Sequence, residues 1–480
     1  VATEPGLHHS DRGDWSQRLW YHFSNILINS PPAIDNRTWT INMISIFSQH
    51  YAEQKVERLQ SLADNIYTTY NQVELEALRI EPVDPQILSQ LSGRGFVNRD
   101  ILETILGNLL ELVAPGSHNA VPLSKQKPTF RGALEEMVDQ LYAMVVQSFL
   151  AVGDASAAEN AATETAFDFF QQLPKLKERA FWNRFASLKD PAVWDAYLNR
   201  QYKRKGPAEI IPPDSDLRDL QTDRLAEVDV PEFINRAIQE RNPHAYNCLL
   251  AESGFRYAFD YQMQLVMSSY PGWRVLFYHD VANALATSEI SPVPLLPRAI
   301  SELGGRYYQA DLHPETEIGD ANFLDHTHRG ITTGQTGVIG YGCVIYPCTL
   351  GGLSTKNQPR HPTIGNFVQI STDVGIFGRV DVSDRSIIGA NTEIYGRIQF
   401  GSEVRIGSSV VIGTVKPDDH SSHQQVRPGM IRVGDQVRIG DGAVIENSLP
   451  LDLVIPDKAI IPTRSHVIND GLGHPKFVNA

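Results

Sequence analysis

Residues 322–330, with the sequence NFLDHTHRG, place an aspartate, two histidines and an arginine within apolar, glycine-punctuated sequence. Histidine titrates near neutral pH, so His326 could take a proton from a hydroxyl group while a carboxylate orients its ring. Two histidines could instead bind a metal ion, or the segment could be a polar corner of the fold. These interpretations require different neighbours around His326.

The elements that must position this segment repeat every six residues. Between residues 364 and 412 every sixth residue is large and apolar, a spacing that neither helix nor strand periodicity explains. A chain that turns a corner every six residues directs such side chains inward and stacks its coils into a solenoid core. The pattern predicts a parallel β-helix with these inward positions: Ile364, Ile370, Ile376, Val382, Ile388, Ile394, Phe400, Ile406 and Ile412.

The composition changes near residue 311, since 24 of the 35 glycines fall in residues 301–480 and helical apolar spacing ends there. We therefore predict an α+β multidomain chain in which an N-terminal α-helical region precedes the β-helix. The expected divisions are a helical extension at 1–216, a helical domain at 217–310, the β-helix at 311–465 and a C-terminal tail at 466–480. Residues 351–363 and 416–432 interrupt the repeat and are expected to leave it as corner loops.

Composition and charge narrow the functional class. The net charge is -14 and both halves of the chain are acidic, which argues against nucleic acid or an anionic membrane as the main partner. The three cysteines have no spacing typical of a disulfide framework or a zinc knuckle. With no apolar run long enough to span a membrane and no signal-peptide pattern, we expect a cytoplasmic protein.

Five short motifs in this region occur in the order found in one enzyme family. They are D-L-H-P at 311–314, L-D-H at 324–326, G-Q-T-G-V-I at 334–339, T-L-G-G at 349–352 and R-H-P-T-I-G at 360–365. With them the chain resembles the serine O-acetyltransferases, left-handed parallel β-helix enzymes of cysteine biosynthesis. The resemblance is specific over 311–413 and extends more loosely to the helical residues from 217. It implies acetyl transfer from acetyl-CoA to the hydroxyl of L-serine by direct histidine-assisted attack, with no metal.

The resemblance also assigns catalytic roles. His326 matches the base, Asp311 its orienting partner and His361 a second active-site histidine. Asp311 and His326 are fifteen positions apart, close to the eighteen residues of one coil with three sides of six, so the spacing permits that pair near one corner. The sequence T-H-R-G adds a residue relative to the family, which leaves His328 as an alternative base.

The resemblance further implies how the substrates bind. Asp325 matches an acid for the ammonium group of the amino acid, and Arg360 matches the partner of its carboxylate. The acid of a helical R-D-P motif is expected at Asn242, where its charge is lost. The residues expected to bind acetyl-CoA are Gly351, Gly352, Lys356, Thr372 and Ala390. Thr372 and Asp373 stand where the family has small residues, and the acid is expected to crowd the donor or repel its phosphates.

Assembly and alternative functions complete the predictions. The resemblance implies a homotrimer or a dimer of trimers with the site between neighbouring β-helices. A complex with cysteine synthase is not predicted, because the sequence ends in GHPKFVNA rather than in isoleucine. The alternatives are an acyltransferase acting on homoserine or another hydroxylated or amino acceptor, a metalloenzyme of the γ-carbonic anhydrase type using His326, His328 and His361, and a non-catalytic scaffold.

Overall fold

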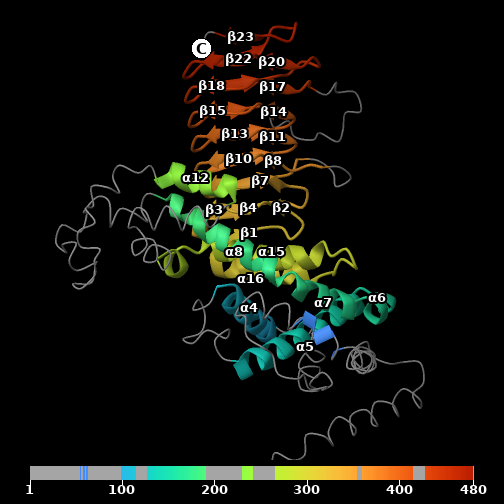
Figure 1. Cartoon of the computed structure of the whole chain (residues 1–480). Coiled ribbons are helices and arrows are strands. Elements are labelled where there is room, and N and C mark those ends of the chain that lie inside the picture. The colour runs from blue at the N-terminus through green and yellow to red at the C-terminus, as the bar shows by residue number, and fades with distance from the viewer. Residues whose placement is uncertain are drawn as a thin grey trace, which may run out of the picture. The chain divides into compact units, whose positions relative to one another are not determined.

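A computed structural model describes residues 55, 58–59, 61–62, 99–114, 127–190, 230–241, 265–353, 359–413 and 428–478. The chain separates into two compact units. One unit comprises Val1–Lys175 and Ala284–Ala299, and the other comprises Leu176–Asn283 and Ile300–Ala480. The described residues up to Tyr308 are mainly helical and those from Ala310 form a left-handed parallel β-helix, which confirms the predicted fold class (Figure 1).

In the first unit, helices pack around α5 (Lys127–Ala151). Its neighbours are α4 (Arg99–Val113), α6 (Ala155–Asn160) and α7 (Ala162–Gln171). Leucines and isoleucines of α4 recur at helical spacing and are buried, so the helix forms by covering one apolar face. The further helical elements are α8 (Leu173–Ala186), η2 (Ser187–Lys189), α12 (Val230–Glu240), α15 (Gly272–Ala286) and α16 (Leu296–Tyr308). Within the described ranges, no helix combines the length and the apolar character that crossing a membrane requires.

The β-helix consists of three sheets, which we number in the order in which the chain meets them. The first sheet contains β1 (Ala310–Asp311), β4 (Ile331–Thr332), β7 (Cys348–Gly351), β10 (Val374–Phe377), β13 (Glu393–Tyr395), β16 (Val411–Ile412), β19 (Val444–Glu446), β22 (His466–Asn469) and β23 (Pro475–Val478). The second contains β2 (Glu317–Ile318), β5 (Val338–Ile339), β8 (Thr363–Ile364), β11 (Val380–Val382), β14 (Ile398–Phe400), β17 (Ile431–Val433) and β20 (Leu453–Ile455). The third contains β3 (Phe323–Leu324), β6 (Val344–Ile345), β9 (Gln369–Ile370), β12 (Ile387–Ile388), β15 (Arg405–Ile406), β18 (Arg438–Ile439) and β21 (Ile460–Ile461). The corners between them are called the 1–2, 2–3 and 3–1 corners below.

The period of six builds the core of the solenoid. All nine inward positions predicted from the sequence are buried, with at most 4% of each residue exposed. Strand pairing stacks them in register, as where Ile376 of β10 lies against Ile394 of β13. The two predicted loops connect β7 to β8 and β16 to β17, and residues 354–358 and 414–427 there lie outside the described ranges. Residues 466–478, predicted as part of a tail, form β22 and β23.

Left-handed backbone conformations produce the regular corners. At the 2–3 corner Arg385, Glu403, Gln436 and Lys458 have φ angles of 58°, 60°, 57° and 59°. This conformation costs a non-glycine residue about 1–2 kcal/mol. Each of the four donates its N–H to a carbonyl of the coil below, at 2.8–2.9 Å, and these bonds help to hold the corner.

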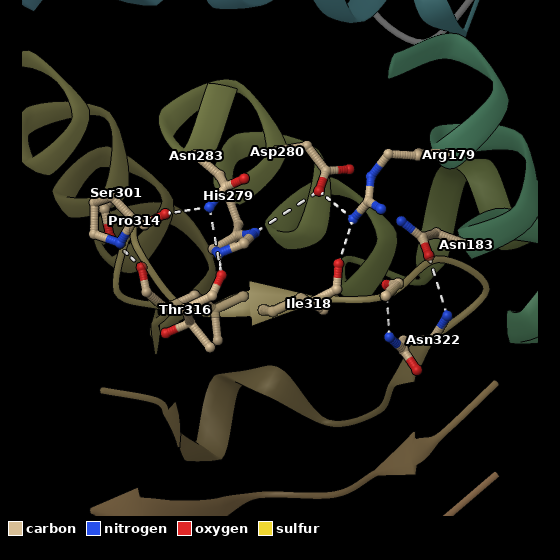
Figure 2. Close-up of polar contacts among 12 residues, drawn as sticks. Arg179, Asn183, His279, Asp280, Asn283, Ser301, Pro314, Thr316, Ile318 and Asn322 are labelled. Carbon is tan, nitrogen blue, oxygen red and sulfur yellow. Dashed lines mark hydrogen bonds and ion pairs between the residues drawn. The ribbon is translucent and has the colours of Figure 1, made fainter. Parts of the chain in front are cut away.

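Helix side chains cover the lower edge of the first coil. A strand edge without a neighbour leaves backbone groups unpaired, which is costly where water is excluded. Nη2 of Arg179 donates to the carbonyl of Ile318 at 2.8 Å, and Nδ2 of Asn283 donates to that of Pro314 at 2.7 Å. Nε2 of His279 also lies 3.0 Å from the Thr316 carbonyl oxygen, and the N–H of Asn322 donates to Oδ1 of Asn183 at 3.1 Å (Figure 2). These side chains substitute for a missing coil.

Breaking the ion pair between Arg179 and Asp280, beside the helix side chains that cover the first coil, should destabilise the protein. Arg179 lies 2.6 Å from Asp280, whose side chain is 4% exposed. Burial alone would raise the pKa of Asp280, but Arg179 and His279 hold it below its usual value. Arg179→Met leaves this carboxylate buried without its guanidinium, so urea denaturation is expected to show a free energy of unfolding lower by about 3–5 kcal/mol.

Arg241→Met is the matched control for that measurement. Arg241 also pairs with a carboxylate, that of Asp320 at 3.1 Å, but its side chain is 57% exposed. Its loss should cost less than about 1 kcal/mol. Equal losses in the two variants would contradict a special role for the buried pair.

Candidate active site

The predicted site residues gather at two different corners of the solenoid. His326 follows β3 and therefore lies at the 3–1 corner, whereas Arg360 and His361 precede β8 at the 1–2 corner. These corners border the first sheet on opposite sides. Within one chain the two histidines are therefore separated by the width of that sheet.

At the 3–1 corner, His326 extends beside a buried carboxylate. Its backbone is left-handed, with φ 49° and ψ 37°, and its side chain is 58% exposed. Nε2 of His326 lies 3.5 Å from Oδ2 of Asp325, and the N–H of His326 donates to Oδ1 of Asp325 at 2.7 Å. The ring of His328 lies 5.9 Å from that of His326, so the alternative base shares this corner.

A second acid, Asp190, belongs to the same corner and was missed in the sequence. It caps the end of η2 and accepts a hydrogen bond from the Tyr270 hydroxyl at 2.8 Å. Burial raises the pKa of Asp325, and the negative charge of Asp190 adds to the effect while His326 opposes it. Burial, Asp325 and Asp190 likewise raise the pKa of Tyr346, whose ring lies 6.2 Å from that of His326.

A motif in the sequence could have identified Asp190. The position expected for the acid of the helical R-D-P motif, Asn242, lies outside the described residues. The sequence Lys189-Asp190-Pro191 is similar to that motif, with lysine in place of arginine, and it retains the acid. Asp190 therefore supplies an acid at this corner, and the assignment of the motif to Asn242 stays a prediction.

Close packing fixes the strand that carries Asp325. Gly272 begins α15, and a Cβ added there would lie 1.9 Å from the carbonyl oxygen of Leu324. Only glycine permits this approach of helix to strand. The N–H of Asp325 donates to the carbonyl of Ile345 at 3.0 Å, which ties the end of β3 to the next coil.

Asp311 lies on β1, whose neighbour in the first sheet is β4. Asp311 pairs with Thr332 in that register, and its carbonyl accepts the N–H of Thr333 at 2.9 Å. The 3–1 corner that carries His326 leads directly into β4. The pairing of the Asp311 carboxylate with His326 stays a prediction.

At the 1–2 corner, hydrogen bonds fix the tautomer of His361. Nδ1 accepts from the N–H of Thr336 at 3.2 Å and lies 2.9 Å from its hydroxyl oxygen. That oxygen already accepts the N–H groups of Arg360 and His361, at 3.0 and 3.3 Å, so its own proton points to Nδ1. The proton of the neutral ring is therefore on Nε2. Burial lowers the pKa of His361, and the positive charges of Arg360 and His313 lower it further.

Two glycines keep space open around the donor atom of His361. A Cβ on Gly334 would lie 1.9 Å from Nε2, and one on Gly352 would lie 2.9 Å from it. His361 itself is only 6% exposed. This arrangement can donate a hydrogen bond to a ligand from a rigid, neutral imidazole.

The residues predicted to bind acetyl-CoA divide between the same two corners. Thr372 and Ala390 follow β9 and β12 at the 3–1 corner, whereas Gly351 and Gly352 lie at the end of β7. Lys356 is outside the described residues. Asp373, expected to repel phosphates, pairs with Arg329 at 3.0 Å, and Arg329 also donates to Thr372 at 3.2 Å. Its charge is therefore partly compensated.

The described residues do not form a metal centre. Over these ranges no group of three histidine, cysteine, aspartate or glutamate side chains is arranged to hold an ion. His361 is at another corner from His326 and His328, so the three histidines do not converge within a chain. Cys343 and Cys348 are buried, and burial raises the pKa of each thiol to about 12.

The fold and these corners define a class: hexapeptide-repeat parallel β-helix proteins with histidines and carboxylates at the corners. Over 138 residues the chain is 33% identical to serine acetyltransferase from Helicobacter pylori, which covers 28% of this chain and 78% of the relative. It is 31% identical over 197 residues to serine acetyltransferase from Mycobacterium tuberculosis, and the match covers 41% of this chain and 69% of that relative. The chain belongs to the serine acetyltransferase family.

The match does not extend over the whole of every relative. Serine acetyltransferase from Synechococcus elongatus is 31% identical over 185 residues, which are 38% of this chain and 61% of the relative. No family model matches the chain.

Proposed function

We propose that the protein transfers the acetyl group of acetyl-CoA to the hydroxyl of L-serine. One observation carries the proposal: an exposed histidine, His326, lies beside the carboxylate of Asp325, whose pKa the nearby charge of Asp190 helps to raise. An amino acid bound there would meet a base for its hydroxyl and negative charge for its ammonium group. Membership of the serine acetyltransferase family supports the same acceptor.

The site we propose needs two chains. The 3–1 corner supplies the base and the acids, but its arginine closest in sequence to His326, Arg329, is already paired with Asp373 at 3.0 Å. Arg360, at the 1–2 corner, has the planar donor pair that binds a carboxylate at two points. The 1–2 corner of a neighbouring chain in a trimer would bring it opposite His326.

In the proposed reaction His326 removes the proton of the serine hydroxyl as its oxygen attacks the thioester carbonyl. A carbon–oxygen bond forms and the carbonyl electrons move onto oxygen. When the tetrahedral intermediate collapses, the carbon–sulfur bond breaks and the thiolate takes the proton back from His326. Asp311 is proposed to orient the base, and Nε2–H of His361 to donate a hydrogen bond to the bound substrates.

The acceptor site should depend on pH through Asp325. Because its pKa is raised, this carboxylate takes up a proton at a higher pH than an ordinary aspartate does as the pH falls. The KM for serine is therefore expected to rise on acidification, starting above the usual range of aspartate. Asp325→Asn should raise that KM about 10- to 100-fold at neutral pH. In this variant the KM should no longer change with pH in the range where Asp325 takes up its proton.

The control for this measurement is Asp381→Asn. Asp381 is on β11 of the second sheet, where it accepts a hydrogen bond from Gln399 at 3.3 Å. The Asp381→Asn substitution should leave the KM for serine and its pH dependence unchanged. An unchanged KM for serine in Asp325→Asn would contradict the assigned role.

The activity itself is tested by following free thiol release from acetyl-CoA with serine and homoserine in parallel. Turnover with serine supports the proposal, and turnover with homoserine alone would assign a different acceptor. Thiol release with neither amino acid, from protein whose unfolding transition shows that it is folded, would overturn acetyl transfer to these hydroxyls.

A further inference from the structure

A basic groove crosses the third sheet in the last coils of the solenoid. It has a volume of about 500 Å³ and is lined by Arg385, Glu403, Arg405, Gln436, Arg438, Lys458 and Ile460. Four of these side chains are cationic and one is anionic. The whole chain has a net charge of -14, so the cations are concentrated here against the overall composition.

Strand register brings the cations into two columns. Arg405 of β15 pairs with Arg438 of β18, and Arg438 pairs with Ile460 of β21. The two arginines therefore lie one strand spacing apart, about 4.8 Å. Two residues before each strand, the 2–3 corner carries Arg385, Glu403, Gln436 and Lys458 in the second column.

Nearby carboxylates do not neutralise these cations. Among the described residues, none forms an ion pair with Arg405, Arg438 or Lys458. Glu403 accepts a hydrogen bond from Nε2 of Gln436 at 2.8 Å. The neighbouring aspartates accept hydrogen bonds from backbone N–H groups, and Asp435, for example, accepts the N–H of Ser402 at 2.7 Å. Like charges directly opposite on a sheet repel, and a bound anion would relieve that repulsion.

The groove continues across the sheet towards the 3–1 corner. A second hollow of about 440 Å³ shares Arg405, Arg438 and Ile460 and extends to Gly407, Gly440 and Thr463. A ligand bound to the arginines can thus make an apolar contact with Ile460, which is 70% exposed. At Gly407 and Gly440 no side chain obstructs its approach to the sheet. His326 is at the same corner beside β3, four strands below β15 and about 19 Å away.

We propose that this basic groove binds the phosphate groups of a nucleotide. The phosphates lie between Arg405 and Arg438, where guanidinium groups form charge-assisted hydrogen bonds with phosphate oxygens, and Arg385 and Lys458 flank them. The same chemistry has two sources, the nucleotide end of coenzyme A or a free nucleotide. Binding to the groove does not depend on the proposed acetyl transfer.

Inorganic tripolyphosphate is the first probe, titrated by calorimetry into the full chain. The double variant R405Q/R438Q should bind it at least about 10-fold more weakly than the wild type, because two charge-assisted contacts are removed. Arg397→Gln, an exposed arginine at the 1–2 corner, is the matched control and should bind as the wild type does. Tripolyphosphate should also raise the Tm of the wild type and of the control but not that of the double variant. Equal affinity in all three proteins would overturn the proposal.

Coenzyme A and ATP then distinguish the two sources. Weaker binding of coenzyme A to R405Q/R438Q, with ATP binding alike in both proteins, assigns the groove to the nucleotide end of the coenzyme. Weaker binding of ATP alone assigns it to a free nucleotide. If the double variant binds both ligands as the wild type does, the groove does not bind nucleotides. These are binding measurements, so a protein that binds through Arg405 and Arg438 but shows no acetyl transfer would refute only the proposed function.

Discussion

Replacing His326 with glutamine is expected to lower kcat for thiol release by about 100- to 10,000-fold, the usual contribution of a general base. Glutamine keeps the approximate size and hydrogen-bonding capacity of the side chain but cannot take up the proton. The KM for serine should change far less than kcat, because the carboxylates of Asp325 and Asp190 remain. Rates of coenzyme A release, followed with a thiol reagent over a range of serine concentrations at saturating acetyl-CoA, give both constants.

His328→Gln is the matched control for the identity of the base. The two rings lie 5.9 Å apart at one corner, so both substitutions change the same surroundings. His328→Gln should retain most of kcat. If it instead lost activity while His326→Gln kept it, His328 would be the base.

Mixing two inactive variants should restore activity if each site uses two corners from different chains. His326→Gln damages only the 3–1 corner, and His361→Gln damages only the 1–2 corner. After joint dissociation and reassembly at equal amounts, about a quarter of the sites should combine an intact corner from each chain, if chains mix at random in a closed ring. Thiol release by the mixture is therefore expected to reach about a quarter of the wild-type rate.

The control for this experiment mixes His326→Gln with the double variant carrying both substitutions. Neither chain then has an intact 3–1 corner, so no activity should return. Failure of the first mixture to recover, although mass measurement shows mixed trimers, would contradict the shared site. Full activity of a monomer would contradict it as well.

The fold could be predicted from the sequence because one physical requirement repeats along it. Each coil must direct an apolar side chain inward at the same place, so positions such as Ile376, Ile388 and Ile394 follow the period without a break. The helical region has no comparable repeat. Its side chains that cover the first coil, such as Arg179 and Asn283, act through contacts with distant residues, which no local pattern reports.

The residues of the candidate site can be proposed from short sequence motifs, whereas their arrangement in space cannot. Short motifs identified His326 and His361, but the order of the motifs along the chain does not reveal at which corner of the β-helix each histidine lies. Their placement at opposite borders of the first sheet follows from the number of strands between them. Asp190 was missed because its tripeptide begins with lysine rather than arginine, and because it approaches Asp325 from a helical element 135 positions earlier in the chain.

The two ends of the β-helix also affect how the protein can associate. A stack of parallel coils is in principle open to growth, because each exposed edge is a template for another strand. At one end, helix side chains occupy the backbone groups of the first coil. At the other, β23 pairs antiparallel with β22 and so departs from the repeating direction. Both ends therefore discourage end-to-end stacking into fibres, and neighbouring chains are left to associate through the sides of the solenoid.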